Sequence, residues 1–223
     1  KYYYKIVAKD SRGTLASNVS SFSTLKEPEW TYSTDYIRSV ATSKDGEYIV
    51  AGADNYKVYL FEKDSGTPLW SYTTGGDINT VAISADGEYI VAGSDDDKVY
   101  IFDKDSSTPL WSYTTGGNVE SVAISADGEH IAAGSHDDKI YLFDKDSSTP
   151  QWSYTCGGTV ISVTISADGK YIVAGDNQGE VFLLGKDSNT LLWSYSSSGQ
   201  IYAIDISADG EYIVAGSDDD KVY

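Results

Sequence analysis

The chain has 223 residues, with 34 acidic and 16 basic side chains and a formal net charge of −18. Coulomb repulsion disfavours nucleic acid and anionic membrane surfaces as partners of such a chain and leaves cationic ligands open. No apolar run reaches the roughly 18 residues that a membrane helix needs, so we expect no membrane insertion in this segment. The 19 tyrosines and 21 glycines favour turn-rich β structure with little helix.

Two segments with β-strand character open the chain. Residues 2–10 (YYYKIVAKD) and residues 17–24 (SNVSSFST) resemble the last two strands of a fibronectin type III domain, so we interpret residues 1–25 as the end of such a domain. A lone hairpin is marginally stable in water, and the resemblance therefore implies that the rest of the domain lies upstream in the same chain. Residues 26–28 are the expected linker, and residues 29–223 are the expected repeat domain.

Tryptophan marks an internal repeat. Trp70, Trp111, Trp152 and Trp193 follow one another at intervals of 41 residues, and Trp30 precedes Trp70 by 40. The string SADGEYIVAG at residues 84–93 returns unchanged at residues 207–216. A fixed period of this length indicates a repeat architecture.

Each period predicts four short strands, called a to d in chain order. In the second period these are residues 78–84, 89–93, 98–103 and 110–115. Asp86-Gly87 predicts a tight hairpin between strands a and b, and Pro109 is tolerated just before strand d. Four antiparallel strands in 41 residues, without helix, predict an all-β fold, namely a β-propeller of four-stranded antiparallel blades.

Two known families resemble the two halves of the period. Residues 84–95 (SADGEYIVAGSD) resemble the a-to-b hairpin of WD-repeat propellers, although Gly75-Gly76 and Phe102 replace that family's Gly-His pair and strand-c Trp. Residues 104–113 (KDSSTPLWSY) are similar to the motif of quinoprotein-like (PQQ-like) propellers, whose strand-d Trp packs between adjacent blades. The resemblance implies this structural role, rather than stacking on a ligand, for Trp30, Trp70, Trp111, Trp152 and Trp193.

Strand a begins at residues 37, 78, 119, 160 and 201, which predicts about five blades. A strand d at residues 30–34 precedes the first blade, and the last blade stops within strand c, so the two ends are complementary and could close a five-bladed ring. The near identity of the last and second repeats instead favours a fragment of a larger propeller with six to eight blades. Uncapped terminal repeats are expected to be frayed or sticky.

Motifs for catalysis or phosphate binding do not occur, so we predict no enzyme and no catalytic, cofactor-binding or metal-binding residues. His130 and His136 replace a Tyr and an Asp of neighbouring repeats, and Cys156 replaces a Thr, which indicates structural roles. The acidic turns, such as residues 95–97, are interpreted as solvated turns that protect sheet edges. Weak surface binding of Ca²⁺ is the alternative.

Two positions differ from repeat to repeat where the rest is nearly constant. One opens strand a and the other lies two residues before it: Tyr36 and Arg38, Asp77 and Asn79, Asn118 and Glu120, Thr159 and Ile161, and Gln200 and Tyr202. If strand a lines a central channel, these residues ring its mouth on the d-to-a loop face. Such diversity on a uniform scaffold is what a recognition surface needs, although drift at an exposed rim gives the same pattern.

We therefore predict a non-catalytic binding or scaffold propeller of a multidomain protein at the cell surface or outside the cell. Its contacts would lie on the d-to-a loop face, and its ligand would be a protein or a glycan. The alternative is a quinoprotein-like propeller of the dehydrogenase type that binds pyrroloquinoline quinone and Ca²⁺. That alternative needs a Trp that stacks on the cofactor in the channel, together with metal-binding carboxylates.

Overall fold

Each repeat folds into one antiparallel sheet in the computed structural model, which describes residues 29–223. Four sheets pair their strands in chain order, β1-β2-β3-β4, β5-β6-β7-β8, β9-β10-β11-β12 and β13-β14-β15-β16, and the fifth pairs β17 with β18. These sheets are blades 1 to 5. The expected all-β propeller fold is confirmed. The described residues form an incomplete propeller, with four four-stranded blades and one two-stranded blade. Within the described residues no helix is long and apolar enough to cross a membrane.

The strand ranges expected for the second period are right to within one residue. Strands a are β1 (Ile37–Thr42), β5 (Ile78–Ile83), β9 (Val119–Ile124), β13 (Val160–Ile165) and β17 (Ile201–Ile206). Strands b are β2 (Tyr48–Ala53), β6 (Tyr89–Ser94), β10 (His130–Ser135), β14 (Tyr171–Asp176) and β18 (Ile213–Ser217). Strands c are β3 (Lys57–Glu62), β7 (Lys98–Asp103), β11 (Lys139–Asp144) and β15 (Glu180–Gly185). Strands d are β4 (Trp70–Thr73), β8 (Trp111–Thr114), β12 (Trp152–Thr155) and β16 (Ser188–Ser196).

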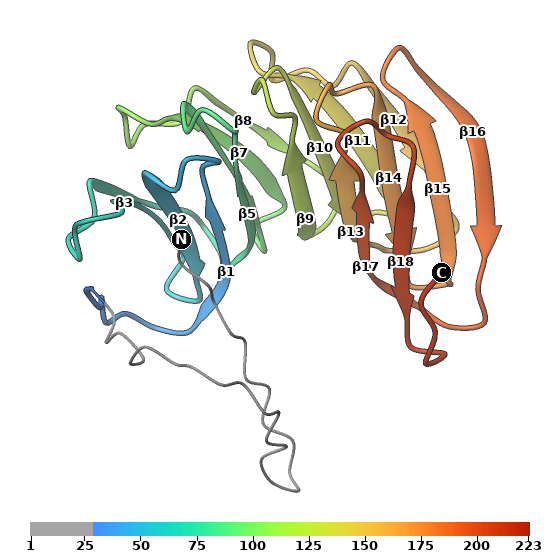
Figure 1. Ribbon diagram of the computed structural model, residues 1–223, viewed down its shortest axis with the longest axis horizontal. Coiled ribbons are helices and arrows are strands. Elements are labelled where there is room, and N and C mark those ends of the chain that lie inside the picture. Colours follow the sequence, from blue (N-terminus) through green and yellow to red (C-terminus); the bar gives the residue numbers. More distant parts are fainter. Residues whose placement is uncertain (1–28) are drawn as a thin grey trace, which may run out of the picture.

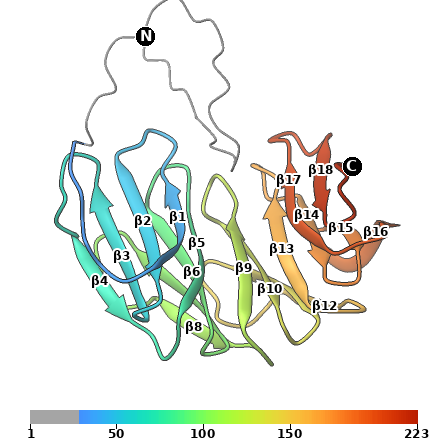
Figure 2. The same ribbon diagram turned by 90° about the horizontal axis from the view of Figure 1, so that it is seen from below.

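The blades stand side by side in an open arc, with blade 1 at one end and blade 5 at the other (Figures 1 and 2). The a strands form its inner row, since β1 contacts β5, β5 contacts β9, β9 contacts β13 and β13 contacts β17. Hydroxyl groups link neighbours in this row: Ser39 Oγ accepts from Val81 N at 3.0 Å, and Ser121 Oγ accepts from Val163 N at 3.0 Å. Because blades 1 and 5 stand at opposite ends of this row, the described residues do not close a ring.

Apolar side chains fill the space between consecutive blades. One cluster joins Val91, Val99 and Ile101 of blade 2 to Val119, Ile131 and Phe143 of blade 3, and all six are fully buried. The same arrangement recurs between blades 1 and 2 and between blades 3 and 4. Burial of apolar area between blades is thus the main force that holds the arc together.

The strand-d tryptophans lie between blades, in the position that the quinoprotein resemblance implies. Trp111 Nε1 donates to Lys145 O of the next blade at 2.7 Å, and its ring centre is 5.3 Å from that of Phe143. Trp70 and Trp152 donate to Lys104 O and Lys186 O in the same way. Trp193 differs from these three in that it is 42% exposed.

The prediction of a strand at residues 30–34 is wrong for the described structure. These residues belong to no strand, since the c strand that would pair with them is not among the described residues. Trp30 and Tyr32 still pack on Phe61, each with ring centres 5.3 Å apart. Residues 30–34 therefore occupy the place of a strand d in front of blade 1 without its hydrogen-bonded sheet.

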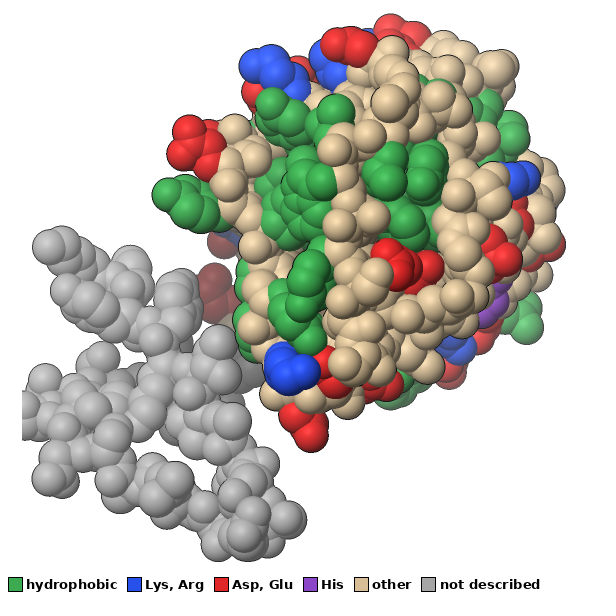
Figure 3. All heavy atoms as spheres, turned by 90° about the vertical axis from the view of Figure 1, so that its right-hand side faces the viewer, with side chains coloured by type: hydrophobic (Ala, Val, Ile, Leu, Met, Phe, Trp, Pro, Cys, Tyr) green, Lys and Arg blue, Asp and Glu red, His purple; other side chains and the backbone are tan. Residues whose placement is uncertain are grey.

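Both ends of the arc carry exposed apolar side chains. Figure 3 views the end formed by β16, β17 and β18, where hydrophobic side chains gather on the surface. The fibronectin-like interpretation of residues 1–25 and the linker at residues 26–28 lie outside the described residues and stay predictions.

Candidate functional site

A β-bulge in strand a of every blade carries the residue that varies most. The pairing between strands a and b skips one residue in each blade, for example between Ile78 and Thr80. The five skipped residues are Arg38, Asn79, Glu120, Ile161 and Tyr202. A bulge breaks the alternation of a strand and re-aims a side chain. In the sequence, the bulge could have been inferred from the three-residue step between the apolar residues Ile78 and Val81, which departs from the two-residue alternation of a regular strand.

The second variable position is fixed by a backbone hydrogen bond to the following b-to-c turn. Asp95 N donates to Asp77 O at 2.9 Å, and Asp54 N donates to Tyr36 O at 3.0 Å. The corresponding acceptors in the other blades are the carbonyl oxygens of Asn118, Thr159 and Gln200. The d-to-a loops and the b-to-c turns therefore share one side of the arc, called the variable face below.

Arg38 is the centre of a charged cluster that spans blades 1 and 2. Its guanidinium donates to the carboxylates of Asp54 and Asp77 and, at 2.7 Å, to Asn79 Oδ1. Asp95 Oδ2 lies 3.9 Å from Arg38 Nη1. The hydrogen bond with Asp54 raises the pKa of Arg38, and burial opposes this rise. Three carboxylates thus surround one permanently charged cation.

The cluster continues into blade 3 through amide side chains. Asp95 Oδ1 accepts from Asn79 Nδ2 and from Asn118 Nδ2, both at 2.7 Å. Next to it, His136 Nε2 lies 2.9 Å from Glu120 Oε1. Five of the ten variable residues, namely Arg38, Asp77, Asn79, Asn118 and Glu120, are therefore engaged in polar contacts on blades 1 to 3.

The other five variable residues are not brought into this cluster. Tyr36 is 73% exposed and Tyr202 is 56% exposed, while Thr159, Ile161 and Gln200 are half-buried. Within residues 29–223, no side-chain hydrogen bond joins them to Arg38 or Asp95. The variable positions are therefore polar and cross-linked over blades 1 to 3 and carry neutral side chains over blades 4 and 5.

The interpretation of the acidic turns as merely solvated is wrong for the middle carboxylate. Asp96 Oδ2 accepts from Tyr100 OH at 2.5 Å and from Gly75 N at 2.8 Å. Asp137 and Asp219 accept from Tyr141 and Tyr223 in the same way, and their side chains are only 10% and 9% exposed. Burial and the adjacent carboxylate raise the pKa of the Tyr100 hydroxyl, which keeps it a donor. These turns are built into the blade.

Blade 4 replaces both members of this pair. Phe182 stands where the other blades have Tyr, and Gln178 stands where blades 2, 3 and 5 have the middle Asp. Gln178 Nε2 donates to Gly157 O instead. In the same turn the carboxylate of Asp176 is buried and accepts from Gln178 N at 3.0 Å and Glu180 N at 2.9 Å. Burial raises the pKa of Asp176.

The remaining polar groups do not form a reactive centre among the described residues. No group of three or more His, Cys, Asp or Glu side chains there is placed to hold a metal ion, and weak Ca²⁺ binding stays a prediction. Burial raises the pKa of the Cys156 thiol to about 12, so the thiol is protonated at neutral pH. His130 occupies the interblade position of a Tyr, beside Gly169.

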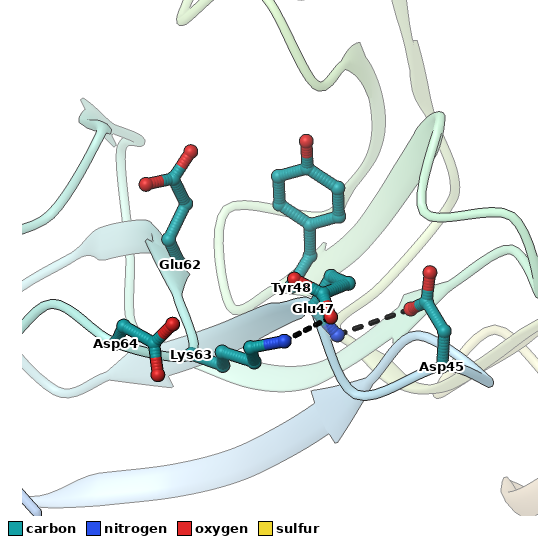
Figure 4. Close-up of a pocket in the computed structure, with 6 residues that line it drawn as sticks. All are labelled: Asp45, Glu47, Tyr48, Glu62, Lys63 and Asp64. Atoms are coloured by element: carbon teal, nitrogen blue, oxygen red, sulfur yellow. Dashed lines mark hydrogen bonds and ion pairs between the residues drawn. The ribbon is translucent and has the colours of Figure 1, made fainter.

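The opposite side of the arc carries the a-to-b hairpins and the c-to-d turns and is called the hairpin face. A shallow hollow of about 380 Å³ opens there on blade 1 (Figure 4). Lys63 Nζ bonds Glu47 Oε1, and Asp45 Oδ1 accepts from Glu47 N at 3.0 Å and from Ser43 Oγ at 2.6 Å. The Lys63 amine and the Asp45 carboxylate are therefore engaged in contacts within blade 1.

Comparison with known families agrees with the repeats. The family model described as outer membrane protein assembly factor BamB matches residues 6–159, which is more than half of the chain. The model described as WD domain, G-beta repeat matches residues 185–223. No curated protein matches the chain. The first match begins at residue 6, inside the segment that resembles fibronectin type III.

Proposed function

The chain belongs to the propeller-repeat family described as outer membrane protein assembly factor BamB, and we propose that it is a non-catalytic binding module whose contact surface is the variable face. The observation that carries this proposal is the row of β-bulges. Each blade has a β-bulge at the same position of strand a. The residue at that position is Arg, Asn, Glu, Ile or Tyr. A backbone geometry that is the same in every blade but presents different side chains suits recognition of a partner better than a reaction catalysed in the same way by each blade.

The charge of the variable face favours a protein partner that supplies Lys or Arg side chains. The carboxylates of Asp54, Asp77 and Asp95 are between 23% and 36% exposed and outnumber the single cation among them. The chain as a whole carries −18. Complementary charge speeds encounter and is screened by salt, so binding should weaken as ionic strength rises.

A location at the cell surface or outside the cell is part of the same proposal. The matched family is described by the name of an outer membrane assembly factor, and a location beyond the cytoplasm agrees with that description. An acidic recognition surface would there meet proteins or glycans of the envelope or matrix.

The quinone alternative is disfavoured by the contacts of the residues that it would use. The carboxylates that converge on the variable face do so around Arg38, whose guanidinium already supplies a positive charge among them. Trp70, Trp111 and Trp152 donate their indole N–H to the next blade and pack between sheets. Neither group is free for a cofactor in the channel.

Binding to an envelope or matrix extract tests the proposal. The immobilised chain is expected to retain a defined protein, identified by mass spectrometry, and to lose it when Asp77, Glu120 and Tyr202 are together replaced by Ala. The matched control replaces Asp105 and Asp146 by Ala, two carboxylates on the hairpin face that are 80% and 77% exposed. Equal retention by both variants would move the contact surface elsewhere.

Titration with pyrroloquinoline quinone and Ca²⁺ tests the non-catalytic part. Absorbance and the melting temperature are expected to stay unchanged over the titration. A saturable shift that requires pyrroloquinoline quinone as well as Ca²⁺ would contradict the proposal in favour of the quinoprotein hypothesis.

A further inference from the structure

One backbone carbonyl group in each of blades 2 and 3 accepts hydrogen bonds from two hydroxyl groups. In blade 2, Gly76 O accepts from Thr74 Oγ1 at 2.7 Å and from Ser94 Oγ at 3.2 Å. Blade 3 repeats the two bonds at 2.6 and 2.9 Å. Thr74 belongs to the d-to-a loop, and Ser94 ends strand b, where it is fully buried. The two hydroxyls thus tie the loop to the strand through a carbonyl group that needs donors.

Blade 4 replaces both hydroxyls at once. Cys156 stands at the repeat position of Thr74. Asp176 stands at that of Ser94, and Gly158 carries the carbonyl group between them. Within residues 29–223 no hydrogen bond reaches Gly158 O. A thiol is a weak donor and an ionised carboxylate is none, so the strongest donor that this pair can offer is the hydroxyl of a protonated Asp176.

The two oxygens of Asp176 have unequal surroundings. The side chain is fully buried, and Oδ1 accepts from Gln178 N at 3.0 Å and from Glu180 N at 2.9 Å. The first of these amides takes the place of Asp96 N, which donates to Ser94 Oγ in blade 2. Oδ2 is enclosed and has no hydrogen-bond partner in the described part of the chain. The carboxyl group thus takes the place of the Ser hydroxyl, with one oxygen satisfied and the other without a partner.

The groups around this carboxyl group are acidic or apolar. They are Glu180 of the same turn, Cys156 of the d-to-a loop, Asp138 of blade 3 next to Cys156, Val160 of β13 and, beside the adjacent Gly175, Ile201 of β17. The lysines of blade 4 pair with Asp168 and Asp187 on the hairpin face, at 2.8 and 2.7 Å. Burial raises the pKa of Asp176 most, and the charge of Glu180 adds to the rise, while backbone hydrogen bonds of the turn oppose it. These surroundings favour the uncharged acid.

We propose that Asp176 is a proton switch in blade 4. In the protonated state, Oδ2–H donates to Gly158 O and closes the b-to-c turn (residues 176–180) on the d-to-a loop (residues 156–159). In the ionised state no hydrogen lies between these two oxygens, which repel each other, and a buried negative charge is left without a cation. The turn then moves away from the loop.

Opening of this turn would change two features of blade 4. Asn177 N donates to Thr159 O at 2.9 Å, and both this bond and that of Gln178 Nε2 join the turn to the loop. Cys156 lies in the same loop and packs against the core cluster between blades 3 and 4, so opening would make its thiol accessible. Thr159 is also a variable position, and the proton would therefore control the variable face at blade 4. The switch itself needs no bound partner.

Nuclear magnetic resonance titration of the Asp176 carboxyl carbon tests the protonation. Its midpoint is expected above that of Asp105, whose side chain is 80% exposed, because burial disfavours the charged form. The folded chain then holds the proton more tightly than the unfolded chain does. Stability should therefore fall as the pH rises from 3.8 through the pKa of folded Asp176. Asp176→Asn, which is neutral at every pH, should lack this fall in urea unfolding.

Hydrogen exchange at single amides tests the movement. Between pH 4 and pH 8 the protection factor of the Asn177 amide is expected to fall at least about tenfold relative to that of the His136 amide. The His136 amide makes the equivalent bond in blade 3, where Ser135 stands in place of Asp176. Cys156 is the single cysteine of the chain, and its alkylation by iodoacetamide should rise over the same range by more than it does in Asp176→Asn.

Asp176→Ser is the matched control. It restores the residue of blades 2, 3 and 5 and supplies a hydroxyl at every pH, so the Asn177 amide should stay protected throughout. Circular dichroism checks folding, and Asp176→Ser also replaces Asp176→Asn if that variant fails to fold. A midpoint at or below that of Asp105, parallel changes at the Asn177 and His136 amides, or equal responses of the unmodified chain and Asp176→Ser would each overturn the proposal.

Discussion

At the scale of one residue, glycine in the a-to-b hairpins has two roles: it adopts a positive φ, and it leaves room for the Tyr of the preceding blade. Gly128 and Gly46 occupy the same repeat position with φ values of +76° and +75°, a backbone region that L side chains seldom adopt. Below Tyr89, Gly128 has no room for a side chain, because an added Cβ would lie 2.7 Å from Tyr89 Cδ2. Gly46 has open space within 4 Å. The two positions therefore differ only in the contact with a preceding blade.

Alanine at these two glycines should measure that contact. Gly46→Ala is expected to lower the free energy of unfolding by about 1–2 kcal/mol through the backbone strain alone. Gly128→Ala should cost about 1–3 kcal/mol more, since the Tyr89 ring must move within a packed interface. Urea unfolding gives both values. Equal losses would mean that the ring of Tyr89 shifts without cost.

The Asp–Tyr pair of the b-to-c turn carries a second prediction at this scale. Tyr100→Phe removes a donor from the half-buried Asp96 carboxylate and should cost about 1–3 kcal/mol. Adding Asp96→Gln copies the Gln178 and Phe182 pair of blade 4 and should recover part of that loss. The two single variants and the double variant form a cycle, read by urea unfolding. Strictly additive losses would contradict the coupling inferred from blade 4.

At the scale of one element, the a-to-b hairpin is a network centred on an Asp. In blade 4, Asp168 Oδ1 accepts from Ser166 Oγ at 2.8 Å and from Lys170 N at 3.1 Å, and Asp168 Oδ2 pairs with Lys170 Nζ at 2.8 Å. The Lys170 side chain first, and then Ser166, lower the pKa of Asp168 from 3.8 to about 2. The pKa values of Asp45 and Asp209 are also lowered, each mainly by a Ser hydroxyl.

This hairpin should make stability depend on pH in the acid range. The folded chain holds the Asp168 proton more weakly than the unfolded chain does, so the stabilising contribution is present above pH 3.8 and is lost as the pH falls through about 2. Urea midpoints between pH 5 and pH 2 should fall less steeply for Asp168→Asn than for the unmodified chain. Lys170→Met should flatten the slope too and raise the pKa of Asp168 in a nuclear magnetic resonance titration. An unchanged slope in both variants would contradict the assignment.

The regular elements were predictable from the sequence because the same strand and turn residues recur in every period. Asp86-Gly87 fixed the hairpin, and the 41-residue spacing of Trp70 and Trp111 fixed the blade, so strand ranges were right to within a residue. The strand predicted at residues 30–34 is absent, because a strand depends on a hydrogen-bonded partner as well as on its own residues. The positions of the candidate site were found by their variation, but the bulge beneath them and the cluster around Arg38 needed the register and the third dimension.

At the scale of the whole molecule, the described residues form a one-dimensional stack in which the main contacts of each blade are with its neighbours. Stability in such a stack is a sum of blade and interface contributions, so the ends are expected to open first. Blade 3 has a neighbour on each side, and its core residues Ile131, Ile140 and Phe143 are fully buried. Among residues 29–223, blade 5 has two strands and one neighbour, and Val214 in β18 is 46% exposed.

Hydrogen exchange should report this gradient. Amides of β17 and β18 are expected to exchange at least about tenfold faster than those of β9 and β10, because opening the end blade disrupts one interface rather than two. Uniform exchange along the chain would mean that the blades open as one cooperative unit, and the stack would then be coupled more tightly than its nearest-neighbour contacts imply.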